Sequence, residues 1–223
     1  MLPPQVFGVS VVDVLGLVSV VLATWFALPQ LVKLRRDGIT AGLSLESLAN
    51  SAVSLTAWTV YGVGHGKVWV VIASAAGIPA TVATITIGLR AGVRLAPKLP
   101  ILWSALLLLT ATVDGRYGSH LIDIVLGCSI LLFVGPAAVT AWRSDDVSGL
   151  ATQTWLVLAA DGAVFGLYGL LANVLADRIY GLTSIAGAAV VLARIAAGQR
   201  QGEQRPGEQR RPRLELEPVA EPA

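Results

Sequence analysis

The stretch Trp25–Gly62, WFALPQLVKLRRDGITAGLSLESLANSAVSLTAWTVYG, decides how the rest of the chain is interpreted. In it an apolar segment ends at Pro29-Gln30, a basic segment follows, and a second apolar segment closes on Tyr61-Gly62. The same plan returns 107 residues later. The matched positions are Pro29 and Pro136, Gly42-Leu43 and Gly149-Leu150, Trp58 and Phe165, and Tyr61-Gly62 and Tyr168-Gly169. A repeat that stays in phase across two predicted helices and their loop predicts two structurally similar halves.

The composition of the chain is that of a membrane protein. Of its 223 residues, 55% are apolar and 13% are charged, and the mean hydropathy is +0.72. A water-soluble surface needs roughly 25–35% charged residues. The net charge of +2 is small and gives no reason to expect a nucleic-acid partner. The single Cys128 excludes an intrachain disulfide and is interpreted as a small packing residue.

Seven apolar segments can each supply the roughly 20 residues needed to cross a hydrocarbon core about 30 Å thick. They are predicted to be helices at residues 9–31, 45–64, 68–89, 98–114, 119–141, 149–171 and 178–197. The fourth lies outside the repeat and is interpreted as a linker. The sequence therefore predicts an all-α integral membrane protein with seven transmembrane helices as 3+1+3 parallel repeats. The predicted units are a first triple-helix bundle at 9–89, the linker helix at 98–114, a second bundle at 119–197 and a disordered tail at 198–223.

Lys and Arg residues are divided unequally between alternate connections of these helices. Thirteen of the 16 lie on the side of the C-terminus, and only Lys67, Arg116 and Arg178 lie on the other side. Because cytoplasmic loops carry the excess of positive charge, we predict a cytoplasmic C-terminus and an N-terminus outside. The Ala- and Arg-rich composition indicates a prokaryotic cell membrane, although an organelle is left open.

Pro29-Gln30, the basic segment after it and the Gly42-Leu43-Ser44 step resemble the PQ-loop repeat, and the 3+1+3 layout resembles the SWEET branch of that superfamily. The resemblance covers residues 9–197, with Pro136-Ala137 standing where the second repeat should have Pro-Gln. It implies that each unit packs its helices in the order 1-3-2 and that the two units enclose a substrate site near the middle of the bilayer. SWEET members move sugars, and other PQ-loop branches move amino acids, some of them with protons.

The two matched prolines are candidate hinges. A proline inside a helix removes one backbone hydrogen bond and kinks the helix, and in a membrane the freed carbonyl must find a partner within the protein. Gln30 is adjacent to Pro29 and offers donors and an acceptor. The resemblance also implies rocking hinges in helices 1 and 5, while a purely structural role for Pro29 in ending its helix stays open. The predicted hinge and gate residues are Pro29, Gln30, Pro136, Tyr61 and Tyr168.

A polar and aromatic stripe follows one face of the second predicted helix. Ser47, Ser54 and Tyr61 are spaced by seven residues, and Asn50 and Trp58 fall beside them. The matched positions in the sixth helix are Thr154, Val157, Asp161, Phe165 and Tyr168. Such a stripe gains nothing from lipid and is expected to face the bundle interior. Hydroxyls, an amide and flat rings there suit a small polyol; the alternative is that they hold helices together.

On the third and seventh predicted helices, the resemblance implies a pocket asparagine in an Asn-x-x-Gly step. The sequence instead has Ser74-Ala75-Ala76-Gly77 and Ser184-Ile185-Ala186-Gly187. A serine offers one short hydroxyl where an amide offers two donors and an acceptor, so we predict a roomier or less polar pocket. The complete set of predicted substrate-binding residues is Asn50, Ser54, Trp58, Ser74, Asp161, Phe165 and Ser184.

Asp161 is an acid near the middle of the sixth predicted helix, which contains no Lys or Arg. Inserting an acid at that depth costs about 2.5–3.5 kcal/mol. Such a carboxyl group either stays protonated or faces a water-filled cavity. We expect Asp161 to contact the substrate or to bind a proton; the alternative is a neutral acid that is hydrogen-bonded across the bundle.

These observations predict a transporter that moves a small polar solute, with a sugar favoured, by alternating access through a central site. The alternatives are a proton-coupled exporter of amino acids or other small metabolites, and a non-transporting receptor or scaffold. The predicted partners are the lipid bilayer and the solute. Neither a cofactor nor a metal is predicted, and a homo-oligomer is left open.

Two other classes of protein do not fit the sequence. A retinal photoreceptor needs a lysine within its last helix, but Lys33, Lys67 and Lys98 all lie at predicted helix ends. An intramembrane enzyme is disfavoured because His65 and His120 have no HExxH or paired-carboxylate partner. We therefore predict no catalytic residue.

Overall fold

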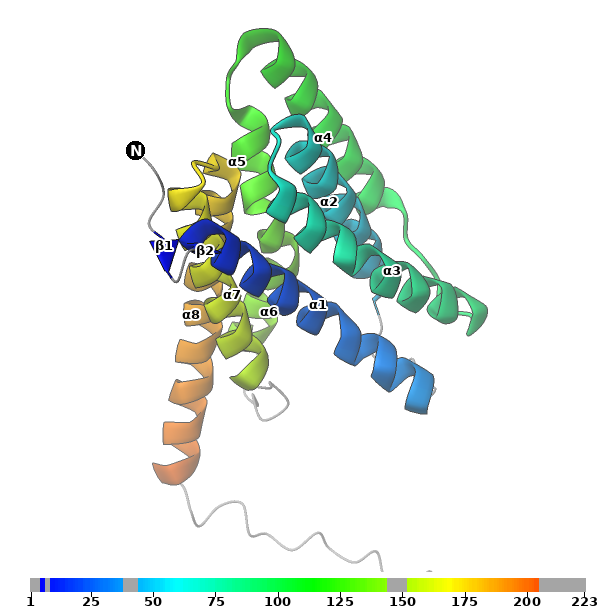
Figure 1. Cartoon of the computed structure of the whole chain (residues 1–223). Coiled ribbons are helices and arrows are strands. Elements are labelled where there is room, and N and C mark those ends of the chain that lie inside the picture. Colours follow the sequence, from blue (N-terminus) through cyan, green and yellow to red (C-terminus); the bar gives the residue numbers. More distant parts are fainter. Residues whose placement is uncertain (1–4, 7–8, 38–43, 144–151, 205–223) are drawn as a thin grey trace, which may run out of the picture.

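The computed structural model describes residues 5–6, 9–37, 44–143 and 152–204, and nearly all of this part of the chain is helical (Figure 1). The helices are α1 (Val11–Asp37), α2 (Leu45–Gly64), α3 (Val68–Arg90), α4 (Lys98–Tyr117), α5 (Leu121–Gly127), the 3-10 turn η1 (Cys128–Ile130), α6 (Leu131–Arg143), α7 (Thr152–Leu171) and α8 (Leu175–Gln204). Two short strands, β1 (Gln5–Val6) and β2 (Val9–Ser10), pair antiparallel just before α1.

Local sequence accounts for several helix ends. The Ser44 side chain accepts a hydrogen bond from the backbone N–H of Ser47 at 3.2 Å and so caps the start of α2. Gly118 ends α4 with a φ of 62°, a left-handed conformation that glycine adopts without a steric penalty. The helices α2 and α7 are each 20 residues long, and their bounds differ by 107, the offset of the sequence repeat.

The predicted end of the first helix was wrong. We placed it at residue 31, before a basic loop, whereas α1 continues to Asp37. Proline has no backbone N–H to donate to the carbonyl one turn earlier, but the hydrogen bonds of the turns that follow it are unaffected. The Lys, Leu and Arg residues after Pro29 favour helix. Similarly, α8 extends to Gln204 and takes in the first residues of the predicted disordered tail. The rest of that tail, residues 205–223, lies outside the described residues.

The fifth predicted helix is also not continuous, because η1 interrupts it between α5 and α6. Just before the break, the Gly127 carbonyl accepts a hydrogen bond from Thr183 Oγ1 of α8 at 3.2 Å. A Cβ at Gly127 would lie 2.7 Å from the carbonyl oxygen of Ala176, so the two backbones approach very closely here. A side chain that bonds into the helical ladder is a recognised cause of such a local change in winding.

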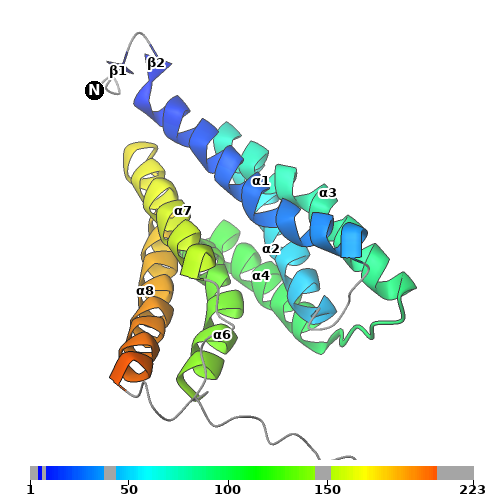
Figure 2. The same cartoon turned by 90° about the horizontal axis from the view of Figure 1, so that it is seen from below.

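Two sets of helices pack side by side. In the first set α3 lies between α1 and α2, and in the second α8 lies between the α5–α6 segment and α7. The helix α4 contacts both α2 and α5, and α1 contacts α7. Figure 2 shows α1 and α7 close together near the start of α1 and diverging further along. Glycines permit the tight α7–α8 contact: a Cβ at Gly181 would lie only 2.5 Å from the Gly162 carbonyl oxygen.

Large apolar side chains cover the outside of the molecule; Leu108 and Leu182, for example, are each 70% exposed. Within the described residues, five helical segments are long and apolar enough to cross a membrane: Val68–Arg90, Lys98–Tyr117, Leu121–Arg143, Thr152–Leu171 and Leu175–Gly198. The apolar part of α1, Val11–Trp25, is shorter. The helix α2 is not among the five, and it carries a series of Ser, Thr and Asn residues. These features define an integral membrane protein.

Candidate functional site

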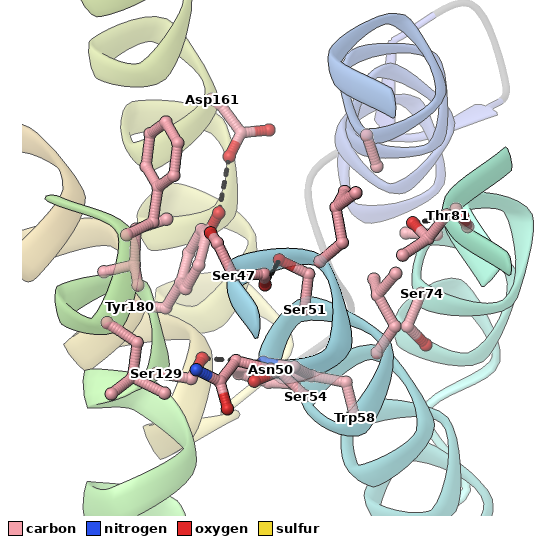
Figure 3. A pocket seen from close by; sticks show the side chains of 18 of the residues that line it. Ser47, Asn50, Ser51, Ser54, Trp58, Ser74, Thr81, Ser129, Asp161 and Tyr180 are labelled. Carbon is pink, nitrogen blue, oxygen red and sulfur yellow. Dashed lines mark hydrogen bonds between the residues drawn. The ribbon is translucent and has the colours of Figure 1, made fainter. Parts of the chain in front are cut away.

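A cavity of about 230 Å³ lies between the two sets of helices (Figure 3). Side chains from α1, α2, α3, η1, α6, α7 and α8 line it. Its polar lining residues are Ser47, Asn50, Ser51, Ser54, Ser74, Thr81, Thr84, Ser129, Asp161 and Tyr180, and its aromatic lining residues besides Tyr180 are Trp58, Phe133 and Phe165. Helices far apart in the sequence therefore build one mixed polar and aromatic chamber.

Positions related by the repeat face this cavity from both sides. Three lining residues of α2 have their counterparts, 107 residues later, among the lining residues of α7. The pairs are Ser51 with Leu158, Ser54 with Asp161, and Trp58 with Phe165. Because 51, 54 and 58 are spaced by three and four, they share one face of α2, and the same holds for their counterparts on α7.

Asp161 is the acidic residue among the described residues that line the cavity. Its side chain is 8% exposed, and its Oδ2 accepts a hydrogen bond from the Tyr180 hydroxyl at 3.0 Å. The other carboxylate oxygen points away from Tyr180 (Figure 3) and accepts no hydrogen bond from the described residues. One half of this carboxylate is thus held by α8, and the other half is free to meet a ligand.

A chain of aromatic rings continues from this carboxylate. The Tyr180 ring packs edge-to-face against Phe165, with centroids 5.3 Å apart, and against Trp58 at 5.9 Å. Trp58 also donates from its indole N–H to Ser129 Oγ in η1 at 3.3 Å, a contact that joins the two sets of helices. Behind it, the Trp103 indole of α4 donates to Ser54 Oγ at 2.9 Å. The cavity wall is therefore fixed by side-chain contacts on several elements.

Several lining hydroxyls use their hydrogen within their own helix. Ser51, Ser74, Thr81 and Thr84 each donate to a backbone carbonyl one turn earlier, over 2.7–3.0 Å. The side chain of Asn50 is 4% exposed, and its buried Oδ1 has no hydrogen-bond partner. A buried amide oxygen without a partner is rare in folded proteins, and this one has almost no accessible surface.

The structure brings most of the predicted substrate-binding residues together. Asn50, Ser54, Trp58, Ser74, Asp161 and Phe165 all line the cavity. Ser184 does not: it is fully buried where α8 packs against α7, and a Cβ at Gly162 would lie 2.7 Å from its own Cβ. Ser184 therefore belongs to the contact between these two helices.

Of the predicted hinge and gate residues, Pro136, Tyr61 and Tyr168 are not among the residues that line the cavity. Pro136 lies within α6, and it is exposed on the surface of that helix. Pro29 and Gln30 fall within α1, but their side chains lie outside what the structure describes. Tyr61 and Tyr168 are buried near the short connections that follow α2 and α7. The hinge and gate roles of these residues stay predictions.

The end of the molecule that holds the two tyrosines is closely packed. The Tyr61 hydroxyl donates to the carboxylate of Asp123 in α5, and the other oxygen of that carboxylate lies 2.9 Å from His120 Nδ1. Lys67 donates to the Ala172 carbonyl oxygen at 2.7 Å, across the two sets of helices. Asp177 is completely buried nearby. These bonds hold α2, α5 and the α7–α8 connection together.

Ser129 and Tyr180 are among the lining residues that were not predicted. Ser129 is the middle residue of η1, the break that the apolar pattern did not reveal. Tyr180 lies four residues before Ser184 and so on the same face of α8, where its long side chain reaches the cavity that Ser184 does not reach. A search of that face for the longest polar side chain could have found it.

Fold and cavity together define a class: a polytopic helical membrane protein with a central, partly polar chamber between two similar sets of helices. The family model of the PQ loop repeat matches residues 11–71 of the chain. The match confirms the resemblance stated for the first repeat. No curated protein and no solved structure matches the chain. Among the described residues, no group of three or more His, Cys, Asp or Glu side chains could hold a metal ion.

Proposed function

We propose that this protein is a membrane transporter that moves a small polar solute by alternating access through the central cavity. In this proposal α1 and α2 also cross the bilayer, and the chain has seven spans arranged as 3+1+3 parallel repeats with α4 as the linker. The N-terminus is outside and the C-terminus is in the cytoplasm, as the distribution of Lys and Arg indicates. A prokaryotic cell membrane is the proposed location, and no residue is assigned a catalytic role.

The observation that carries the proposal is the lining of the cavity by repeat-related pairs. Ser54 with Asp161 and Trp58 with Phe165 approach one chamber from α2 and α7. A binding site at the interface of two structural repeats can be exposed to either side when the repeats rock against each other. Polar groups at membrane depth in such a position mark a substrate path.

The packing of the helices supports the same proposal. Each set places its third helix between the other two, with α3 between α1 and α2 and α8 between α5–α6 and α7. The two sets are joined near the tyrosine-rich end and diverge along α1 and α7 (Figure 2). This arrangement suits a chamber that is closed at one end and accessible from the other.

The resemblance to SWEET proteins favours a sugar as the solute, and flat rings next to hydroxyls suit one. A proton-coupled exporter of amino acids or another small metabolite is the alternative, because Asp161 could carry a proton through the cycle. A non-transporting receptor or scaffold is the second alternative. Uptake measured in liposomes separates these possibilities.

The test is uptake into proteoliposomes that hold the purified full chain. A panel of radiolabelled sugars, amino acids and amines is offered with and without an imposed pH gradient, and empty liposomes are the control. We expect saturable uptake of at least one solute, and counterflow when the liposomes are preloaded with it. Binding of a solute without any uptake or counterflow would assign the protein to the receptor or scaffold class.

A further inference from the structure

The cavity has an unbalanced charge. Among the described residues that line it, Asp161 is an acid, and there is no Lys, Arg or His. A buried carboxylate without a positive partner is costly, since its loss of hydration is not repaid by an ion pair. A positively charged ligand would supply the missing partner, whereas an anionic ligand would add repulsion.

The geometry of Asp161 suits such a ligand. Tyr180 bonds only to Oδ2, at 3.0 Å, which keeps the carboxylate in place and leaves its other oxygen open to the cavity. A hydrogen bond that involves a charged group is worth about 1.5–3 kcal/mol. An ammonium group placed at the open oxygen would make this bond without displacing Tyr180.

The rings next to Asp161 strengthen the preference for a cation. Tyr180 lies between Phe165 and Trp58, with ring centroids 5.3 Å and 5.9 Å away. Aromatic faces attract a cation within about 6 Å of their centroid, and Trp does so best. Tyr180, Phe165 and Trp58 all line the cavity together with Asp161, so a cation held by the carboxyl group could meet the face of one of these rings.

Several of the remaining polar groups in the lining are available only as hydrogen-bond acceptors. The hydroxyl hydrogens of Ser51, Thr81 and Thr84 are used on backbone carbonyls, and the Trp58 N–H is used on Ser129. The buried Oδ1 of Asn50 is an acceptor without a partner. An ammonium or hydroxyl group of a ligand could donate to these hydroxyl oxygens, and the hydroxyls of Ser54 and Ser129, which accept from Trp103 and Trp58, still have hydrogens to donate to the rest of the ligand.

We infer that the cavity binds a small organic cation, a primary amine with an apolar or aromatic body and no carboxylate. The ammonium group is held by Asp161 and lies against the Trp58–Tyr180–Phe165 rings, and the body of the ligand extends toward α2 and α3. The inference rests on the proposed transport function for its biological meaning, but the binding itself does not depend on transport. The inference narrows the proposed solutes to those that carry a positive charge, because the charge determines whether they bind.

The test uses three probes that share a phenol ring and differ in charge: tyramine, a cation; tyrosol, its uncharged alcohol counterpart; and tyrosine, which adds a carboxylate. Binding to the full chain in detergent is measured by isothermal titration calorimetry for the wild-type protein and for Asp161→Asn and Asp161→Glu. We expect tyramine to bind at least about tenfold more tightly than tyrosol or tyrosine. The preference should disappear in Asp161→Asn and return in Asp161→Glu.

A matched control separates the cavity from a general loss of charge. Asp114 lies on α4 outside the cavity lining, and Asp114→Asn removes the same charge. This variant should keep the tyramine preference. Thermal denaturation of each variant shows whether it is folded, and retained binding of tyrosol by Asp161→Asn serves the same purpose.

The outcomes distinguish the inference from the proposed function. If tyramine binds no better than tyrosol, or if Asp161→Asn keeps the full preference, the inference is wrong, even when the uptake panel shows transport of a sugar. If tyramine binds with the expected preference but no solute in the panel crosses the liposome membrane, the site is as inferred and the transport function is wrong.

Discussion

Trp58 both lines the cavity and joins the two sets of helices. Its ring faces the cavity, contacts Tyr61 and Tyr180, and its N–H reaches Ser129 across the two sets of helices. A phenyl ring at this position would keep most of the ring contacts and lose the hydrogen bond, which is worth about 1 kcal/mol. Loss of the whole ring would remove both.

We therefore expect Trp58→Ala to weaken binding of the transported solute by about tenfold or more, and Trp58→Phe to weaken it by about fivefold or less. Titration of the purified variants measures this. Trp142, which is 57% exposed on α6, provides the control, because Trp142→Phe should bind like the wild-type protein. Equal binding by all three variants would make Trp58 a packing residue only.

Gly181 illustrates how a missing side chain positions helices. A Cβ at this position would lie 2.5 Å from the Gly162 carbonyl oxygen and 2.6 Å from Gly166 Cα, both backbone atoms that cannot move aside. We expect Gly181→Ala to push α7 away from α8 and to destabilise the protein by about 1–3 kcal/mol. Thermal denaturation in detergent measures the loss. Gly115→Ala is the control, because nothing lies within 4 Å of a Cβ there, and it should not lower the stability.

Single residues could be predicted where a repeat and a helical period coincided. Asn50, Trp58 and Asp161 stood out because they are polar or aromatic on one face of an apolar helix. Ser129 and Tyr180 have no such signal. The position of Ser129 depends on a contact between α5 and α8, and Tyr180 reaches the cavity only because its side chain is long. Tertiary contacts of this kind are not encoded in local periodicity.

At the scale of the helices, apolar runs and Gly, Ser and Pro residues predicted most of the bounds. The bounds of α2 were predicted to the residue, and those of α3 within one residue. The continuation of α1 past residue 31 was missed because the basic residues after Pro29 were interpreted as a loop, although Lys, Leu and Arg favour helix. The break at η1 was missed because every neighbouring segment is apolar.

The span that contains η1 and Pro136 has two places where it could bend. If Pro29 and Pro136 are the hinges, replacing both with Ala should straighten the helices and slow solute exchange, while binding from one side persists. The measurement is counterflow in proteoliposomes next to a binding titration. Pro79→Ala in α3 removes another proline inside a helix and should not slow exchange if it has no hinge role. Normal exchange in the double variant would leave η1 as the bend to examine.

At the scale of the whole molecule, the unequal distribution of Lys and Arg makes a prediction about topology. A reporter that is active only in the cytoplasm should be active when fused after Gln204, the end of α8, and inactive when inserted at Lys67 between α2 and α3. Cells that express the two fusions give the answer, with protein levels compared by immunoblot. Activity at both positions would mean that the proposed number of spans is wrong.

The equivalence of Ser54 and Asp161 has a consequence for the origin of the molecule. Two identical copies of one repeat, assembled as a symmetric dimer, would place the same side chain at both positions and so provide either two carboxylates or none. Two like charges facing one small chamber would repel each other and resist ionisation together. Duplication within a single gene, followed by divergence of the copies, removes that restriction. The fused chain can hold one negative charge to one side of its pseudo-symmetry axis, a polarity that no symmetric pair of its halves could possess.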